Sequence, residues 1–481
     1  MSKLYIFGIG GTGSRVLRSF TMLLASGVKL GGDINEVVPI IIDPDGQNGD
    51  LTRTVGLMNS YINVRSKLHF NNENPNTFFK VDIKSLLQNF LLPINNTQSC
   101  KFKAFINLSG MTRPNEAMMR ILFSSHNLEA DMDKGFKGNP NIGCVVLNQI
   151  ASSSEFIQLT NTFQSGDKIF IISSIFGGTG ASGFPLLLKT LRSKNEEIPN
   201  FAAINNATIG AITMLPYFNV KQDNNSEIDS STFISKTKSA LAYYQDNIIG
   251  NNTIDALYYL GDEQNNNYDN HDGQAMQKND AHLIEFLAAS AIVDFTHQKI
   301  IPRTDPSYDQ NTQALNMEFG IERATNNEIT ISDFYSGTRN DIIKPMAHFL
   351  LMANTFSHDA SYVMSQKLNA NQILGIEEEF YHEPFSKTLF AFLNNYQEWL
   401  DEMKNNKRSL NLFNTNPGDH PFDLITAMKA KPYHSLRSNY SLLYDFINGA
   451  SRKVKTKENE DKLLELYSTA TEKAINGKFN F

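Results

Sequence analysis

The chain contains two glycine-rich loops, and each lies between an apolar segment and an amphipathic one. Residues 4–7 are apolar and precede Gly8-Ile-Gly-Gly-Thr-Gly13, and residues 168–175 precede Phe176-Gly-Gly-Thr-Gly-Ala-Ser-Gly183. Glycine permits tight turns and a close approach to a ligand, and a helix that follows offers unpaired N–H groups and a positive dipole end to an anion. Two such loops in one chain predict a polyphosphate held from two sides.

Apolar strands and amphipathic helices alternate over roughly the first 260 residues. Ser14 is expected to cap the first helix, whose apolar residues recur at the spacing of one helix face. Strands are expected at 37–42, 103–108, 168–175, 207–216 and 254–260. This alternation predicts an α/β fold, with a mostly parallel sheet, helices on both faces and ligands at the carboxyl ends of the strands.

The second half of the chain changes character at a long apolar segment. Residues 280–297 are apolar nearly all round, which is typical of a buried central helix, and from residue 332 the pattern is helical. We therefore expect a nucleotide-binding domain over 1–278 and a central core helix over 279–299. A linker or insertion with one short strand at 315–321 should follow over 300–331, and a helical C-terminal domain over 332–481.

Composition excludes several classes of function. The 481 residues carry a net charge of −7, so no basic field points to nucleic acid. The two cysteines, Cys100 and Cys144, and the ten histidines show no spacing typical of a metal site. We expect no leader sequence at the start of the chain, and no window of about 18 apolar residues predicts a membrane span. A soluble protein of the reducing cytoplasm is expected.

The second loop resembles the G-G-T-G-[SA]-G signature of the tubulin and FtsZ superfamily over Gly177 to Ser182. It lacks the lysine of a P-loop, which argues against that class of NTPase. Other segments match in order: the first loop resembles the family's first phosphate loop, residues 42–47 its N-T-D-A-Q segment, residues 215–218 its L-P-F segment and residues 279–284 the start of its core helix. The resemblance covers roughly residues 1–300 and implies a divergent member, of the kind found in bacteria outside cell division.

The resemblance implies GTP or GDP as the cofactor. Asp280 would read the guanine base, although an ordinary helix N-cap is the alternative, and Asp43 and Asp45 could hold Mg²⁺ through water. The loop at 109–114 stands where the family has its γ-phosphate loop. The nucleotide-binding residues expected on this basis are Gly8, Gly10, Gly11, Thr12, Gly13, Asp43, Asp45, Gly110, Thr112, Gly177, Gly178, Thr179, Gly180, Ala181, Ser182 and Asp280.

Departures from the family pattern bear on catalysis and partners. The family completes hydrolysis with an acidic loop that reaches the nucleotide of the neighbouring subunit, and here Asp333 alone matches that loop. Asp333 is the candidate catalytic residue, with a helix cap as the alternative, and acids at Asp305, Asp309 and Glu318 are the fallback. We therefore expect slow or absent GTP hydrolysis. The family implies head-to-tail self-association, and the helical C-terminal region, which replaces a β-rich domain, suggests a protein partner.

Two other interpretations stay open. Gly8 to Ser14, with Asp43, Asp45 and Arg53, also resembles adenylating enzymes of the ubiquitin-activating, ThiF-like class. That class usually carries a catalytic cysteine and paired C-x-x-C zinc ligands, and neither is recognisable here. It also gives no reason for the second glycine loop. The third interpretation is a non-catalytic scaffold that a bound nucleotide stabilises.

Overall fold

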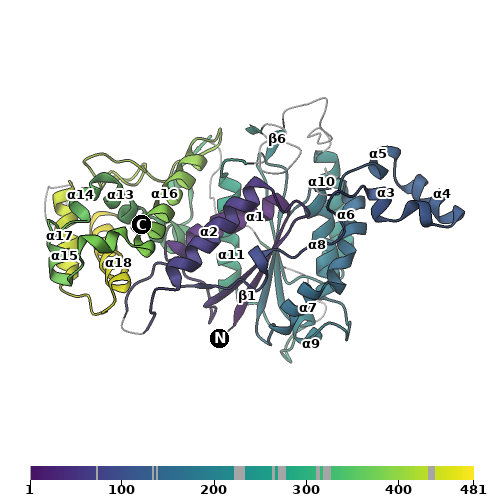
Figure 1. Cartoon of the computed structure of the whole chain (residues 1–481), viewed down its shortest axis with the longest axis horizontal. Helices are drawn as coiled ribbons and strands as arrows, with labels where there is room; N and C mark the ends of the chain where they lie inside the picture. The colour runs from purple at the N-terminus through teal and green to yellow at the C-terminus, as the bar shows by residue number, and fades with distance from the viewer. Residues whose placement is uncertain are drawn as a thin grey trace.

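Figure 1 shows the computed structural model of the chain, which places the α/β part beside a helical C-terminal part. The structure describes residues 2–71, 74–132, 135–136, 139–220, 233–262, 266–268, 278–309, 315–317, 327–431 and 439–481. The expected acid Glu318 lies outside these residues.

Within the described residues the main sheet has seven strands in the order β3-β2-β1-β4-β5-β7-β9, and every pair in it is parallel. Its inner strands are continuous apolar runs because helices cover both faces of the sheet. This confirms the expected α/β class. The strands are β1 (Lys3–Ile9), β2 (Glu36–Ile42), β3 (Asp82–Ile83), β4 (Lys168–Ser174), β5 (Thr208–Met214), β7 (Ala256–Leu260) and β9 (Leu315–Met317).

The helices of the α/β part form two layers around this sheet (Figure 1). One layer contains α1 (Gly10–Ala25), α2 (Gly49–Arg65) and α11 (Leu283–His297), and the other contains α6 (Pro140–Leu147) and α8 (Gly178–Leu191). The remaining helices of this part are α3 (Phe102–Phe105), α4 (Arg113–Leu122), α5 (Ser125–Leu128), α7 (Ser154–Asn161), α9 (Phe201–Asn205) and α10 (Phe233–Tyr244).

The predicted central helix is α11, and it is buried along nearly its whole length. It packs against α1 and the strands β5 and β7 on one side. On its other side, Phe286 faces Trp399 of the C-terminal part, with ring centroids 6.4 Å apart. A helix that is apolar all round needs such cover on every side.

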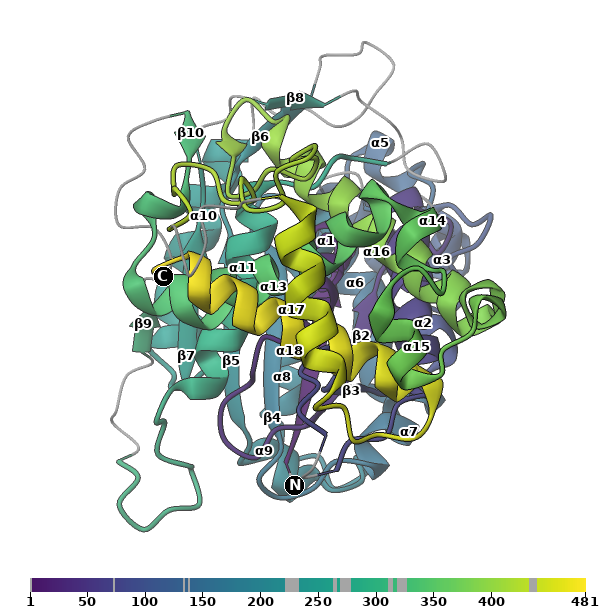
Figure 2. The ribbon, with the colours of Figure 1, turned by 90° about the vertical axis from the view of Figure 1, so that its left-hand side faces the viewer.

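The C-terminal part is helical, as expected, and Figure 2 shows its helices in front of the sheet. A two-stranded parallel sheet of β10 (Glu328–Ile329) and β11 (Ser409–Leu410) is attached to it. The helices of this part are α12 (Ser336–Thr338), α13 (Lys344–His358), α14 (Ala360–Val363), α15 (Asn369–Leu374), α16 (Pro384–Lys404), α17 (Tyr440–Ser451) and α18 (Asn459–Lys478).

Two local expectations were wrong. The segment 103–108 is not a strand, because α3 and a short 3-10 turn at Leu108–Gly110 occupy it, and the strand beside β2 is β3. Ser14 does not cap α1, since the helix begins four residues earlier at Gly10. The short strand expected within 300–331 is present as β9, which pairs with β7 at the edge of the main sheet.

Aromatic side chains join the α/β part to the C-terminal part. Phe78 and Phe79, which follow α2 in the chain, lie edge-on to Phe349 of α13, with ring centroids 5.1 and 5.7 Å apart. Phe349 also contacts Phe392 and Tyr396 of α16. Edge-to-face rings in a buried cluster add to the free energy gained from burial. The two parts therefore share one core.

We expect Phe349→Ala to lower the free energy of unfolding by about 3–5 kcal/mol, since it leaves a cavity in this shared core. Because the core is shared, the whole chain should unfold in one step. Urea titration followed by Trp399 fluorescence and by far-ultraviolet circular dichroism should shift together. Two separated transitions, with the circular dichroism midpoint unchanged, would show that the parts are independent.

Candidate functional site

The two glycine loops lie where the strand order of the sheet reverses. From β1 the chain moves to β2 on one side, and from β4 it moves to β5 on the other side, while β1 and β4 are neighbours. In doubly wound sheets the crevice for ligands opens at the carboxyl ends of two such strands. The first loop follows β1 and the second follows β4, so both border this crevice.

The loops contact each other across the crevice. Gly10 has φ +72, in the left-handed region that favours glycine. A Cβ atom at Gly10 would lie 3.5 Å from the Cβ atom of Thr179 and 3.9 Å from the backbone nitrogen of Gly180. The space over Gly11 is open, because a Cβ atom there would have no neighbour within 4 Å. The fold thus brings together the residues of both predicted loops.

Both helices begin inside the loops without a side-chain cap. The residues that precede their first turns, Ile9 and Gly177, donate or accept no side-chain cap hydrogen bond, and neither first turn contains an acidic residue. The leading N–H groups of α1 and α8 are therefore left for a ligand, and two positive dipole ends meet at one place. An anion is the ligand that such a site suits.

Other glycines let the helices approach the strands closely. A Cβ atom at Gly13 would lie 2.7 Å from the Cα atom of Gly8, and one at Gly180 would lie 2.8 Å from the backbone nitrogen of Ser174. No real Cβ contact is that short, so these positions need glycine for packing. Ser182 is also structural, since its buried hydroxyl donates to the Gly178 carbonyl at 2.7 Å within α8.

Asp43 and Asp45 lie just after β2, beside the first loop. The Asp45 N–H donates to Oδ1 of Asp43 at 2.9 Å, and the Gln47 N–H donates to Oδ1 of Asp45 at 3.2 Å. Burial raises the pKa of Asp43 from 3.8 to about 7, against the opposing effect of the hydrogen bond from Asp45. Asp43 is therefore protonated in part at neutral pH, which lessens its repulsion of a phosphate.

A buried ionic network below the first loop escaped sequence reasoning. Arg15 of α1 donates to Glu285 of α11 at 2.5 Å, to Asp50 of α2 at 3.2 Å and to the Tyr217 hydroxyl at 2.6 Å. All four side chains are buried. The signal for it in the sequence was Arg15 within the apolar stretch of the first helix, where a charge requires a partner. The network fixes the start of α1 relative to α11.

Asp280 lies at the approach to α11 and is exposed. It is not the N-cap of that helix, because His282 caps it and forms a capping box with Glu285. Partial desolvation and the nearby Glu402 raise the pKa of Asp280, and Arg53 and Arg18 oppose this effect. The structural alternative for Asp280 is thereby removed, and its predicted role as the residue that reads the base stays a prediction.

Gly110 and Thr112 are not brought to the loops. They lie in an arm of α3, α4 and α5 that projects at the end of the molecule (Figure 1), and α4, which follows Thr112, contains no buried residue. The strand that should have carried them to the sheet edge does not form. In this structure the arm therefore supplies nothing to the crevice.

Asp333 caps a short 3-10 turn, Ile331–Asp333. Its Oδ2 atom accepts from the backbone N–H of Thr330 at 2.8 Å and from the Thr330 hydroxyl at 3.1 Å. The next residue, Phe334, packs against Phe286 near the start of α11, with ring centroids 6.1 Å apart. Asp333 is thus on the same end of α11 as the glycine loops, and its carboxylate is engaged in local structure.

The loop after α11 lies at the amino ends of the strands, opposite the glycine loops. Thr296, in the last turn of α11, accepts from the Gly31 N–H at 2.8 Å, and Gly31 precedes β2. In this loop Arg303 pairs with Asp255 just before β7, and Asp305 and Asp309 are exposed. Hydrogen bonds from Ser307 lower the pKa of Asp305, so it remains ionised. These acids therefore lie at the opposite end of the strands from the glycine loops.

Among the described residues, no group of three or more His, Cys, Asp or Glu side chains could hold a metal ion by itself. Asp43 and Asp45 could still contribute to Mg²⁺ binding in company with phosphates, which commonly supply part of its coordination. In the part of the chain that the structure describes, the helices are too short or too polar to span a membrane.

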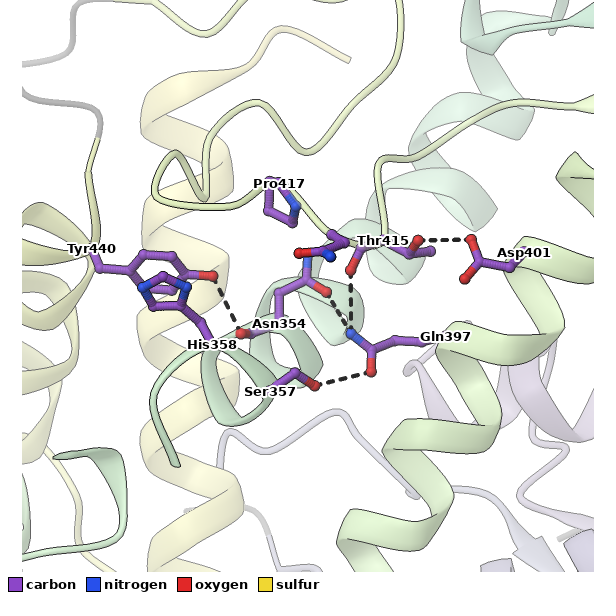
Figure 3. A pocket seen from close by; sticks show the side chains of 9 residues that line it. Asn354, Ser357, His358, Gln397, Asp401, Thr415, Pro417 and Tyr440 are labelled. Carbon is purple, nitrogen blue, oxygen red and sulfur yellow. Dashed lines mark hydrogen bonds between the residues drawn. The ribbon is translucent and has the colours of Figure 1, made fainter. Parts of the chain in front are cut away.

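A pocket of ≈ 290 Å³ lies in the C-terminal part, among α13, α16 and the start of α17 (Figure 3). Gln397 bonds Asn354 and Ser357 in it, Thr415 donates to Asp401, and His358 stacks on Tyr440. No lysine or arginine lines it. Several of its polar groups bond one another, and one uncapped helix start, that of α17, borders it.

The sequence matches no protein-family model and no curated protein. Among solved structures, 54% of the chain overlaps CetZ2 from Haloferax volcanii in a GTPγS-bound protofilament, with 12% identity and a TM-score of 0.27. An empty FtsZ dimer from M. jannaschii overlaps the same 54% of the chain, with 17% identity and a TM-score of 0.26. CetZ from Methanosaeta thermophila also overlaps 54% of the chain, with 15% identity and a TM-score of 0.23. The overlap covers 45–49% of those chains, less than half of each. At this level of superposition it says nothing about the ligand of this chain.

The pKa of Asp43 makes stability depend on pH. In the folded chain Asp43 keeps its proton up to about pH 7, whereas its ordinary pKa is 3.8, so the folded state binds more protons between these values. Its contribution to the free energy of unfolding should therefore fall as pH rises through this window. Asp43→Asn should be more stable than wild type at about pH 8 and gain little at about pH 4, by urea titration. A difference that is constant with pH would contradict this assignment.

Proposed function

We propose that the crevice between the two glycine loops binds a nucleoside polyphosphate, and that guanine is the preferred base. The observation that carries the proposal is the contact of two uncapped helix N-termini, α1 and α8, at the point where the strand order reverses. Neither loop contains a lysine or arginine that would neutralise phosphate charge. Backbone N–H groups and the helix dipoles would supply this neutralisation instead.

Asp280 is the residue that would read the base. Guanine presents an N1–H and an exocyclic amine, and a carboxylate can accept from both, whereas adenine lacks this pair of donors. With adenine bound, the carboxylate would lose its water without gaining hydrogen-bond donors, which costs binding free energy. Guanine should therefore be preferred. The resemblance to the tubulin and FtsZ superfamily supports the same base. It also supports head-to-tail assembly in the cytoplasm.

Arg53 is among the residues that carry the resemblance to adenylating enzymes. Its guanidinium donates to Glu402, Asp50 and the Asn279 carbonyl, so it is engaged within the protein. ATP-dependent pyrophosphate exchange would nevertheless favour that class. The scaffold alternative differs from our proposal only in turnover, and a turnover measurement separates the two.

We expect Gly10→Ala to weaken GDP binding at least tenfold, because the new side chain would occupy the contact with Thr179 and strain the loop. Gly32→Ala is the matched control. Gly32 also has a positive φ, +62, but it lies at the amino ends of the strands, away from the glycine loops, and has open space around it. Both variants should lose about 1–2 kcal/mol of stability, and only Gly10→Ala should lose affinity for GDP by isothermal titration calorimetry. Wild type should bind GDP more tightly than ADP.

Equal affinity of Gly10→Ala and Gly32→Ala for GDP would place the nucleotide elsewhere. Equal affinity of wild type for GDP and ADP would count against Asp280 as the residue that reads the base.

We expect GTP hydrolysis by the isolated protein to be slow or absent, and Asp333→Ala to leave it unchanged, because the Asp333 carboxylate caps its own turn. If the rate of hydrolysis per molecule rises with protein concentration, Asp305→Ala or Asp309→Ala should lower it. Both acids lie at the amino ends of the strands, opposite the glycine loops. Phosphate release from GTP at two protein concentrations about tenfold apart measures both effects. Fast release that Asp333→Ala abolishes and Asp305→Ala spares would contradict this expectation.

A further inference from the structure

The backbone on both sides of Asp280 is held by side chains from other segments. Asp280 lies in an irregular stretch before α11, where no helix or strand satisfies the peptide groups. Even so, the N–H and C=O groups of Asn279 and of Ala281 each have a side-chain partner. Four such bonds around one exposed residue fix its position.

The α2 helix holds the residue before Asp280. The Asn279 N–H donates to Oδ1 of Asp50 at 3.0 Å, and its carbonyl accepts from Arg53 at 2.5 Å. Asp50 is buried and also accepts from Arg15. The segment is therefore tied to the same network that fixes the start of α1.

The C-terminal part holds the residue after Asp280. The Ala281 N–H donates to Oε2 of Glu402 at 2.8 Å, and the Ala281 carbonyl accepts from Nδ2 of Asn406 at 2.5 Å. Glu402, in the last turn of α16, also accepts from Arg18 of α1 at 2.5 Å and from Arg53 of α2 at 2.9 Å. One carboxylate thus joins α1, α2 and the Asp280 segment to the C-terminal part.

We infer that Glu402 and Asn406 are positioning residues for base recognition: they hold Asp280 in place for the base, so the C-terminal part completes the nucleotide site. This inference rests on the proposed function. A binding group must be held close to its productive geometry by the residues around it. Here those residues come from a part of the chain that contains neither glycine loop.

The test compares GDP with inorganic pyrophosphate as ligands of the full-length protein, by isothermal titration calorimetry. Pyrophosphate reports on the glycine loops alone, and GDP reports on the loops and the base. Glu402→Gln and Asn406→Ala should each lower the affinity for GDP about tenfold, about 1.4 kcal/mol, and leave that for pyrophosphate unchanged. Combined with Asp280→Asn, Glu402→Gln should add little further loss, because both act on one interaction.

Asp255→Asn is the matched control. Asp255 is a carboxylate that also lies between two arginines, Arg192 and Arg303, but it is located just before β7, at the amino ends of the strands. It should lower stability and leave the ratio of the two affinities unchanged. Asn406→Ala removes a single hydrogen-bonding side chain. If Glu402→Gln does not fold, the affinities of Asn406→Ala for GDP and pyrophosphate test the inference.

An equal fall of both affinities, or no fall for GDP, would overturn the inference. Wild-type protein that binds pyrophosphate but gains nothing from the guanosine of GDP would overturn it as well. Wild-type protein that binds neither ligand would overturn the proposed function itself.

Discussion

Pairing of buried charges constrains how this chain folds. Arg15 and Arg18 of α1 are buried, and a buried cation left without a partner costs several kcal/mol. Their partners come from α2, α11 and α16, which are far apart in the sequence. The fold must therefore bring these four helices together, and with them the start of the first glycine loop. Removal of one partner would leave the others buried and unpaired.

This constraint explains the geometry of the crevice. With α1 fixed from behind, Gly10 is held against Thr179, and the first turns of α1 and α8 border the same crevice. The glycines at positions 13 and 180 add to this, because they allow each helix to lie almost on its strand. The site is thus preorganised by packing and by buried ion pairs, and loop side chains contribute little to it.

Much of this could be predicted from the sequence, because the signals were local. Strand, glycine loop and helix follow one another twice, and the apolar residues of α11 predict its burial. The failures involved contacts between distant segments. The run at 103–108 is as apolar as a strand, yet nothing local shows that the two-residue strand β3 takes the place beside β2. Arg15, Glu285 and Glu402 are ordinary charged residues until the fold brings them together.

For Asp333, the catalytic role stays a prediction, but the structure shows where its carboxylate lies. Its spacing from the core helix matched an acidic loop, but spacing does not reveal on which end of a helix the chain returns. The structure returns it to the end that carries the glycine loops. Asp305 and Asp309 lie at the opposite end of the strands, and no pattern in the sequence distinguishes them from other exposed acids.

Amide hydrogen exchange with and without GDP tests the central claim most directly. If the polyphosphate is held between two helix N-termini, exchange should slow in both glycine loops, at residues 10–14 and 177–182, because the same N–H groups then bond to phosphate. Residues of the arm, 108–122, should be unaffected. Slower exchange in one loop alone, or in neither, would contradict a site built from the two helices together.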